Sequence, residues 1–161
     1  MPVHPVPVRQ PSIERSRQLR WERVMALRES KDVLVVDDDS GIRHLLCVAL
    51  IRQALSVDVA VDGSDALDRL KEKNYTVLVL DLMMPRVDGF GVLAALNDGG
   101  IAKENEPVVL VMTAFDARHD LPIMAETVHA IVRKPFDLPE MVDLVAGCVR
   151  TKRNHASPSA D

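Results

Sequence analysis

Apolar and polar residues divide the middle of the chain into two kinds of segment. Short runs of β-branched and aliphatic residues favour strands, and longer segments with apolar residues at helical spacing favour helices. The pattern predicts strands at residues 32–37, 57–61, 76–81, 107–112 and 129–133. It predicts helices at residues 40–55, 64–73, 89–98, 117–126 and 137–150, of which 117–126 is the weakest because Pro122 interrupts it. The expected order is therefore a series of strand–helix units.

Three of these strands are apolar without alternation. They read "DVLVVD" (32–37), "TVLVLD" (76–81) and "PVVLVM" (107–112). Continuous apolar runs are typical of parallel strands that are covered on both faces. With right-handed crossovers, the units form an α/β fold with a doubly wound parallel sheet, whose ligand site is expected at the carboxyl ends of the strands.

The two ends of the chain differ from this middle. Residues 1–30 begin with "MPVHPVPVRQP", an extended Pro-rich tail, and continue with an amphipathic helix in which Trp21, Val24 and Met25 share one face. This face can pack on the domain, pair with another chain, bind a partner, or belong to a partly frayed helix. Residues 151–161 are expected to be a disordered tail, so the domain is predicted to cover residues 31–150.

Composition and charge narrow the class of protein. The 161 residues are 47% hydrophobic but only 3% aromatic, which indicates one domain with an aliphatic core. Residues 31–150 carry 12 basic and 20 acidic side chains, and this excess of negative charge argues against a nucleic-acid surface. No membrane span or signal peptide is evident, and Cys47 and Cys148 show neither zinc spacing nor a disulfide framework. A cytoplasmic protein is expected.

Polar residues gather where the predicted strands end. They are Asp37, Asp38 and Asp39 after the first strand, Asp81 at the end of the third, Thr113 and Ala114 after the fourth, and Lys134 and Pro135 after the fifth. Parallel strands end at the same edge of a sheet, so these residues should converge. Crowded carboxylates resist full ionisation, and a hard cation such as Mg²⁺ relieves this repulsion. Such a site could hold a phosphoryl group, with a carboxylate as the nucleophile and a lysine as its counter-charge.

The stretches "VLVVDDDS", "VLVLDLMMPRVDGFGVL", "VVLVMTA" and "VRKPF" resemble, in order and spacing, the receiver domain of two-component response regulators. The resemblance covers about residues 31–150 and implies a flavodoxin-like, five-stranded sheet of order 2-1-3-4-5 with five helices. It implies that Asp81 accepts the phosphoryl group. It also implies a Mg²⁺ or Mn²⁺ site made by Asp37, Asp38, Asp81 and the backbone carbonyl of Met83.

The same resemblance assigns the residues around the phosphoryl group. Thr113, Ala114 and Lys134 would contact it, and the Lys134–Pro135 peptide would be cis. Asp39 lies outside the acidic pair of the family, so Asp39 or Ser40 is expected to cap the next helix. Met83 and Phe115 would border the path of the hydrolytic water, and because both are apolar we expect slow self-dephosphorylation.

The expected function is that of a stand-alone response regulator rather than an enzyme. It would receive its phosphoryl group from a histidine kinase or phosphotransfer protein, and would signal by protein contact or onward phosphotransfer. A homodimer through the N-terminal helix or the fourth and fifth units is a further expectation. Two alternatives stay open. Ile131 stands where many receivers carry an aromatic residue, which slightly favours a phosphorylation-independent adaptor, and an aspartyl-nucleophile phosphatase is disfavoured because Met83 replaces its second acid.

Overall fold

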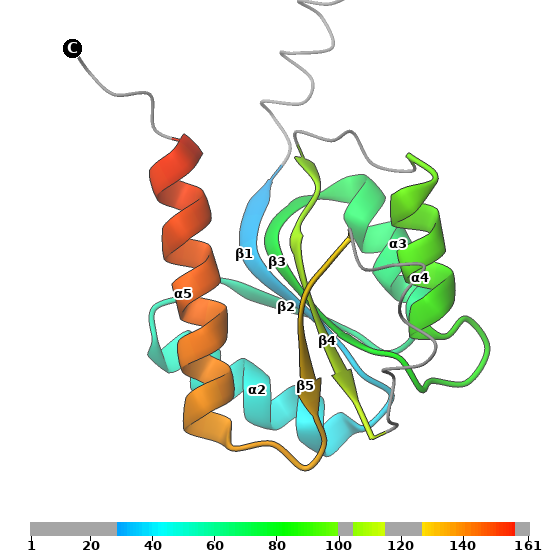
Figure 1. Ribbon diagram of the computed structural model, residues 1–161, viewed down its shortest axis with the longest axis horizontal. Coiled ribbons are helices and arrows are strands. Elements are labelled where there is room, and N and C mark those ends of the chain that lie inside the picture. The colour runs from blue at the N-terminus through cyan, green and yellow to red at the C-terminus, as the bar shows by residue number, and fades with distance from the viewer. Residues whose placement is uncertain (1–28, 100–104, 115–126, 157–161) are drawn as a thin grey trace, which may run out of the picture.

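The computed structural model describes residues 29–99, 105–114 and 127–156, in which five strands form one parallel sheet of order β2-β1-β3-β4-β5 (Figure 1). The strands are β1 (Ser30–Val36), β2 (Val57–Ala60), β3 (Asn74–Asp81), β4 (Val108–Thr113) and β5 (Val128–Arg133). The helices among these residues are α2 (Ser40–Arg52), α3 (Gly63–Glu72), α4 (Gly89–Asn97) and α5 (Leu138–Ala156). The predicted fold class and strand order are confirmed.

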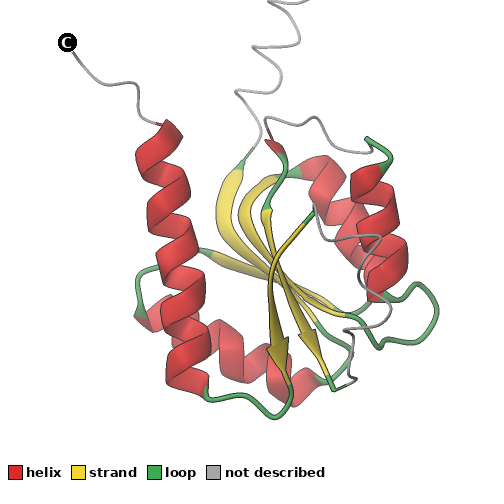
Figure 2. Cartoon of the chain, in the orientation of Figure 1, coloured by secondary structure: helices red, strands yellow, loops and turns green. Residues whose placement is uncertain are grey.

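Helices cover both faces of the sheet, α2 and α5 on one face and α3 and α4 on the other (Figure 2). Strand β1 shows why its sequence does not alternate. Val33 and Val35 pack beneath α2 and α5, whereas Leu34 and Val36 pack beneath α3 and α4, and all four are fully buried. Each side of a parallel strand therefore faces a core, and successive residues are equally apolar.

The helix α5 is longer than its sequence pattern predicts. It continues to Ala156, so residues 151–156 are helical and do not belong to the disordered tail that was predicted. Two polar contacts tie these last turns to the sheet. A guanidinium nitrogen of Arg153 donates to the Asp32 carboxylate, and Lys152 Nζ donates to the backbone carbonyl of Glu106. Tertiary partners thus continue a helix whose polar sequence gives little sign of it.

Other differences are small or fall outside the described part of the chain. Helix α2 ends at Arg52 rather than at residue 55, because Ala54 adopts a left-handed backbone conformation with φ of 58°. The predicted helix at 117–126, the N-terminal extension up to residue 28 and residues 157–161 lie outside the described residues. None of the described helices combines the length and hydropathy that a membrane crossing requires.

Candidate functional site

Three carboxylates meet at the carboxyl ends of β1 and β3. Asp37 and Asp38 follow β1, Asp81 ends β3, and one oxygen from each lies within 4.8 Å of the other two. Asp37 is fully buried and Asp81 is 3% exposed, whereas Asp38 is open to solvent. The register of β1 against β3 brings them together, since Val36 lies opposite Leu80, immediately before the two acids. The predicted convergence of these acids is confirmed.

Lys134 completes the cluster from the end of β5. Its ammonium group donates to Oδ2 of Asp37 at 2.7 Å and to Oδ2 of Asp81 at 2.8 Å. The lysine reaches this position because β5 pairs with β4, and the backbone N–H of Lys134 donates to the carbonyl of Thr113 at 2.8 Å. The Lys134–Pro135 peptide is cis, as predicted. One ammonium group thus neutralises part of the charge of two buried carboxylates.

The titration of these groups reflects burial and mutual contact. Burial raises the pKa of the Asp37 carboxyl, and the nearby negative charge of Asp81 acts in the same direction, while the hydrogen bond from Lys134 partly opposes them. For Lys134, burial favours the neutral amine, but hydrogen bonds to Asp37 and Asp81 outweigh it and raise the pKa. The lysine therefore stays charged at neutral pH, and the cluster keeps a built-in cation.

The acidic loop is fixed by the start of α2. The Asp39 carboxylate caps this helix by accepting from the N–H groups of Gly41 and Ile42 at 2.7 and 3.1 Å, as predicted. Arg43, in the first turn, donates to the carbonyls of Asp37 and Asp38 at 2.6 and 2.9 Å. Arg43 was not predicted as a site residue. A sequence feature could have indicated its role. Arg43 is a cation in the first turn of a helix, where the helix dipole disfavours positive charge unless another contact compensates.

The loop after β3 folds back onto the backbone of Asp81. The Met83 N–H donates to Oδ1 of Asp81 at 3.1 Å, while the Met83 side chain is 58% exposed at the rim. Gly89, the first residue of α4, has no room for a side chain, because a Cβ there would lie 2.4 Å from the Asp81 carbonyl oxygen and 2.7 Å from Cα of Leu82. Gly89 was not predicted as a site residue, although the Asp88–Gly89 pair marks a tight turn.

The other predicted residues are placed as follows. Thr113 is buried at the end of β4, and Ala114 is exposed just beyond it. Ile131 of β5 is 48% exposed and gives this position no aromatic ring. Phe115 lies outside the described residues. Strands β4 and β5 therefore bring Thr113 and Lys134 to the same edge of the sheet as the acids.

The cluster suits a hard divalent cation. Its donors are carboxylate oxygens, which Mg²⁺ prefers, and it includes no sulfur or imidazole ligand. Asp38 is exposed, so one side of the cluster is open to solvent. The residues present thus fit the metal that the resemblance implies.

Comparison with known proteins agrees with this geometry. Residues 33–146 match the family model of the response regulator receiver domain. The chain is 35% identical over 135 residues to the response regulator MprA of Mycobacterium tuberculosis, a match that covers 79% of this chain and 54% of that protein. It is 32% identical over 130 residues to the transcriptional regulatory protein TrcR of the same organism, a match that covers 80% of this chain and 49% of that protein. The chain thus spans about half the length of the curated relatives it matches.

Solved structures extend the comparison. A CheY-like receiver domain from Methanospirillum hungatei superposes with a TM-score of 0.67 at 28% identity, over 76% of this chain and 97% of that one. The response regulator TrrA of Thermotoga maritima, solved in complex with Mg²⁺ and BeF, superposes with a TM-score of 0.62 at 29% identity. This match covers 73% of this chain and 98% of that one. The chain therefore belongs to the response regulator receiver domain family.

Proposed function

We propose that this chain accepts a phosphoryl group on Asp81 from the phosphohistidine of a partner protein. The nitrogen–phosphorus bond of the donor breaks and a bond between phosphorus and an Asp81 carboxylate oxygen forms. The observation that carries the proposal is the pair of contacts from Lys134 to Asp37 and Asp81, at 2.7 and 2.8 Å, within a cluster of three carboxylates. Such a cation beside a nucleophilic carboxylate is what phosphoryl transfer requires.

Each residue has a part in this step. Lys134 holds Oδ2 of Asp81 and the Met83 N–H holds Oδ1, so the carboxylate is oriented before the donor arrives. As negative charge moves onto the phosphoryl oxygens, the Lys134 ammonium can follow it. The Thr113 hydroxyl would donate to one oxygen, with the Ala114 N–H as a second donor. Asp37, Asp38, Asp81 and the Met83 carbonyl would hold Mg²⁺, which supplies positive charge for the phosphoryl oxygens.

The decisive experiment uses a small phosphodonor. The protein is incubated with Mg²⁺ and acetyl phosphate, and the site is mapped by intact and peptide mass. We expect an added mass of about 80 Da, one phosphoryl group, on Asp81, and none in Asp81→Asn. Asp88→Asn is the matched control, because Asp88 lies in the same loop and caps α4 without joining the cluster. Labelling that persists in Asp81→Asn would refute the assignment.

The same reaction separates the two alternatives. A phosphatase would release many equivalents of phosphate per chain, whereas a phosphoacceptor would incorporate about one. An adaptor would show no labelling, and its binding would be insensitive to Asp81→Asn. The adaptor stays an alternative because the exposed Ile131 stands where many receivers carry an aromatic residue. Signalling by stand-alone action, a cytoplasmic location and a homodimer stay predictions.

A surface beside the cluster favours a protein donor. Leu45, Val48 and Ile51 are exposed on the side of α2 that faces away from the core, at 47%, 37% and 54%. Helix α2 starts at the acidic loop, so a protein that covers this apolar stripe also reaches the rim above Asp81. We propose the stripe as the contact for the phosphohistidine protein. In soluble proteins, aligned apolar residues of this kind mark interaction sites.

Comparing phosphorylation by a partner protein with phosphorylation by acetyl phosphate distinguishes an effect on docking from an effect on the chemical step. Val48→Glu should slow phosphorylation by a cognate kinase or phosphotransfer protein by about tenfold, roughly 1.4 kcal/mol, because a charge would be desolvated in the contact. Phosphorylation by acetyl phosphate should be unchanged. Asp68→Lys, a charge change on the exposed face of α3, serves as control. Equal rates for wild type and Val48→Glu with the protein donor would exclude this surface.

A further inference from the structure

An apolar groove lies between α5 and the amino ends of β4 and β5, at the end of the sheet opposite the acidic cluster. We call it the α5 groove. Its volume is about 550 Å³, and it is lined by Val108, His129, Asp143, Leu144, Gly147, Cys148, Thr151, Lys152 and His155. Val108 and Leu144 are only partly buried, so the groove presents aliphatic surface to whatever enters it. A volume of this size is typical of sites that bind side chains or small molecules.

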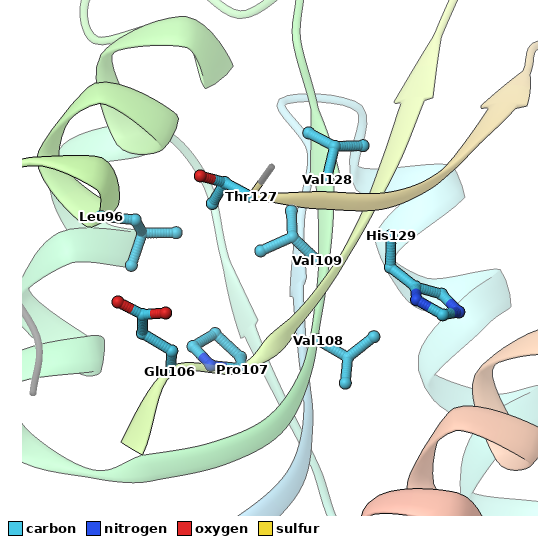
Figure 3. A pocket seen from close by; sticks show the side chains of 8 residues that line it. All are labelled: Leu96, Glu106, Pro107, Val108, Val109, Thr127, Val128 and His129. Atoms are coloured by element: carbon cyan, nitrogen blue, oxygen red, sulfur yellow. The ribbon is translucent and has the colours of Figure 1, made fainter. Parts of the chain in front are cut away.

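A second hollow, shown in Figure 3, shares Val108 and His129 with this groove but opens toward α4. In the close-up, His129 lies on the side nearer α5, whereas Leu96 and Glu106 lie on the other side of β4. The hollow in Figure 3 is lined in part by the Glu106 carboxylate and the Thr127 hydroxyl. The α5 groove is the more apolar of the two and the better fit for large apolar side chains.

Gly147 makes the wall of the α5 groove open. A Cβ added at this residue would meet nothing closer than Nη2 of Arg150, at 3.9 Å. A glycine in the middle of a helix lowers helix stability relative to alanine. At residue 147 this loss of stability is accompanied by open space at the surface of the helix. Space of this kind can receive a side chain from another segment.

The chain enters the domain beside the α5 groove. Ser30, the first residue of β1, lines a pocket together with Lys152 and Arg153, and Lys152 also lines the α5 groove. Trp21 precedes Glu29 by eight residues. Eight residues span about 12 Å as a helix and roughly 27 Å when extended, and the chain entry at Ser30 and the groove share Lys152 as a neighbour, so the extension starts beside the groove that it would fill.

We propose that the apolar residues Trp21, Val24 and Met25 of the N-terminal extension occupy the α5 groove of the same chain. A tryptophan buries about 150–250 Å² of surface when it packs, so covering the aliphatic lining of the groove with Trp21 would be favourable. The charge of the domain as a whole attracts the extension, because residues 13–28 carry five Arg and two Glu whereas residues 31–150 carry 12 basic and 20 acidic side chains, but within the groove itself Asp143 is the acidic residue of the lining. The proposal is independent of the function proposed for Asp81.

Fluorescence tests this directly, because Trp21 is the only tryptophan of the chain. In the full-length protein, acrylamide should quench Trp21 about threefold less than it quenches free tryptophan amide, since docking shields the ring. Gly147→Leu adds a side chain at the groove wall, where its Cβ would have no contact closer than 3.9 Å, and leucine favours the helix, so the fold should be kept while the shielding is lost. Arg150→Leu places the same side chain on the same helix outside the groove lining and should leave quenching as in wild type. Full quenching in wild type would overturn the proposal.

A crosslink locates the contact and identifies the occupant. Met25→Cys is combined with Cys47→Ser, which leaves Cys148 in the groove as the one other thiol. Mild oxidation by glutathione disulfide should join the introduced thiol to Cys148 within one chain, found by peptide mass, at a yield that does not depend on protein concentration. Such a bond requires Cα atoms within about 7 Å. A disulfide only between chains, increasing with concentration, would assign the groove to a second copy and refute the intrachain contact.

Discussion

Lys134 Nζ lies 2.8 Å from Oδ2 of Asp81, although 53 residues separate them in the chain. The contact links the ends of β3 and β5, which are not adjacent in the sheet because β4 lies between them. The lysine side chain therefore crosses the end of β4 to reach the acid. Its loss would leave Asp37 and Asp81 close together, both buried, without this counter-charge.

The first prediction follows from that loss. Lys134→Met should lower the free energy of unfolding by roughly 3 kcal/mol in EDTA, the range for a buried ion pair that has lost one partner. Millimolar Mg²⁺ should restore more stability to the variant than to wild type. Lys31→Met removes an ammonium from a partly exposed pair with Glu29 and should cost less than about 1 kcal/mol. Denaturant unfolding with and without Mg²⁺ measures both, and equal losses would contradict the assignment.

The acidic run should divide into two separable roles. Asp38→Ala should abolish the increase in melting temperature caused by Mg²⁺ while leaving metal-free stability nearly unchanged, because the role proposed for this exposed acid is to bind the metal. Asp39→Ala should keep the response to Mg²⁺ but cost about 1 kcal/mol, since its carboxylate caps α2. Thermal melts in EDTA and in Mg²⁺ provide the comparison. Identical behaviour of the two variants would show that the division is wrong.

Arg43 should affect the metal without touching it. Arg43→Ala removes the donor to the carbonyls of Asp37 and Asp38, so the acidic loop loses its fixed geometry. We expect Mg²⁺ affinity to fall about tenfold, the size of effect usual for residues that orient metal ligands. Arg52→Ala, at the other end of α2, is the control and should bind Mg²⁺ normally. A titration followed by thermal shift decides between them.

Asp32, near the amino end of β1 and so at the end of the sheet opposite the acidic cluster, should make the stability of the fold sensitive to acid. Burial alone would raise the pKa of this carboxyl, but hydrogen bonds from Ser56 and the charge of Arg153 outweigh burial and lower the pKa. A lowered folded pKa stabilises the protein above the unfolded value of about 3.9 and loses that contribution as pH falls through the folded pKa. Asp32→Asn should therefore lose stability at pH 7 but show a flatter decline below about pH 5.

Unfolding free energies between pH 7 and pH 3 measure this difference. Asp68→Asn, which removes an exposed carboxylate paired with Lys71, should follow the wild-type curve. If the unfolding free energy of Asp32→Asn falls with pH as steeply as that of the wild type, groups other than Asp32 cause the acid sensitivity of the fold.

Phosphoryl lifetime should depend on Met83 and Phe115, which the family resemblance assigns to the path of the hydrolytic water. Met83→Asn with Phe115→Glu should accelerate loss of the phosphoryl group by about tenfold, or roughly 1.4 kcal/mol, since polar groups can orient the attacking water. The decay of phosphorylated protein in excess Mg²⁺, after removal of the donor, provides the rates. Equal decay in variant and wild type would show that these residues do not control the water.

The fold was predictable from sequence because its strongest signals are local. Continuous apolar strands such as β1 and β3, with helical spacing between them, specify a parallel sheet covered on both faces, and the acids at strand ends specify the edge where they meet. The strand order came instead from the family resemblance. The cap of α2 could be narrowed to Asp39 or Ser40 from the sequence, since helix caps depend on residue type and position, and the structure shows that it is Asp39.

Other features depend on contacts that are distant in the sequence. Arg43 binds backbone carbonyls, which carry no sequence signature, and the close approach of Gly89 to Asp81 follows from how one loop folds back on a strand. The end of α5 was misplaced because its last turns are polar and are held by Asp32 and the Glu106 carbonyl. Propensity alone does not reveal tertiary contacts of this kind.

These contacts of α5 determine where the domain can be cut or joined. A chain shortened to residue 150, the boundary that the sequence pattern suggests, would lose Lys152 and Arg153 together. It would leave Asp32 without its guanidinium partner near the start of the inner strand β1, and would shorten one wall of the α5 groove. A fusion partner or tag is therefore better attached after Ala156, where the helix has ended and both polar ties remain.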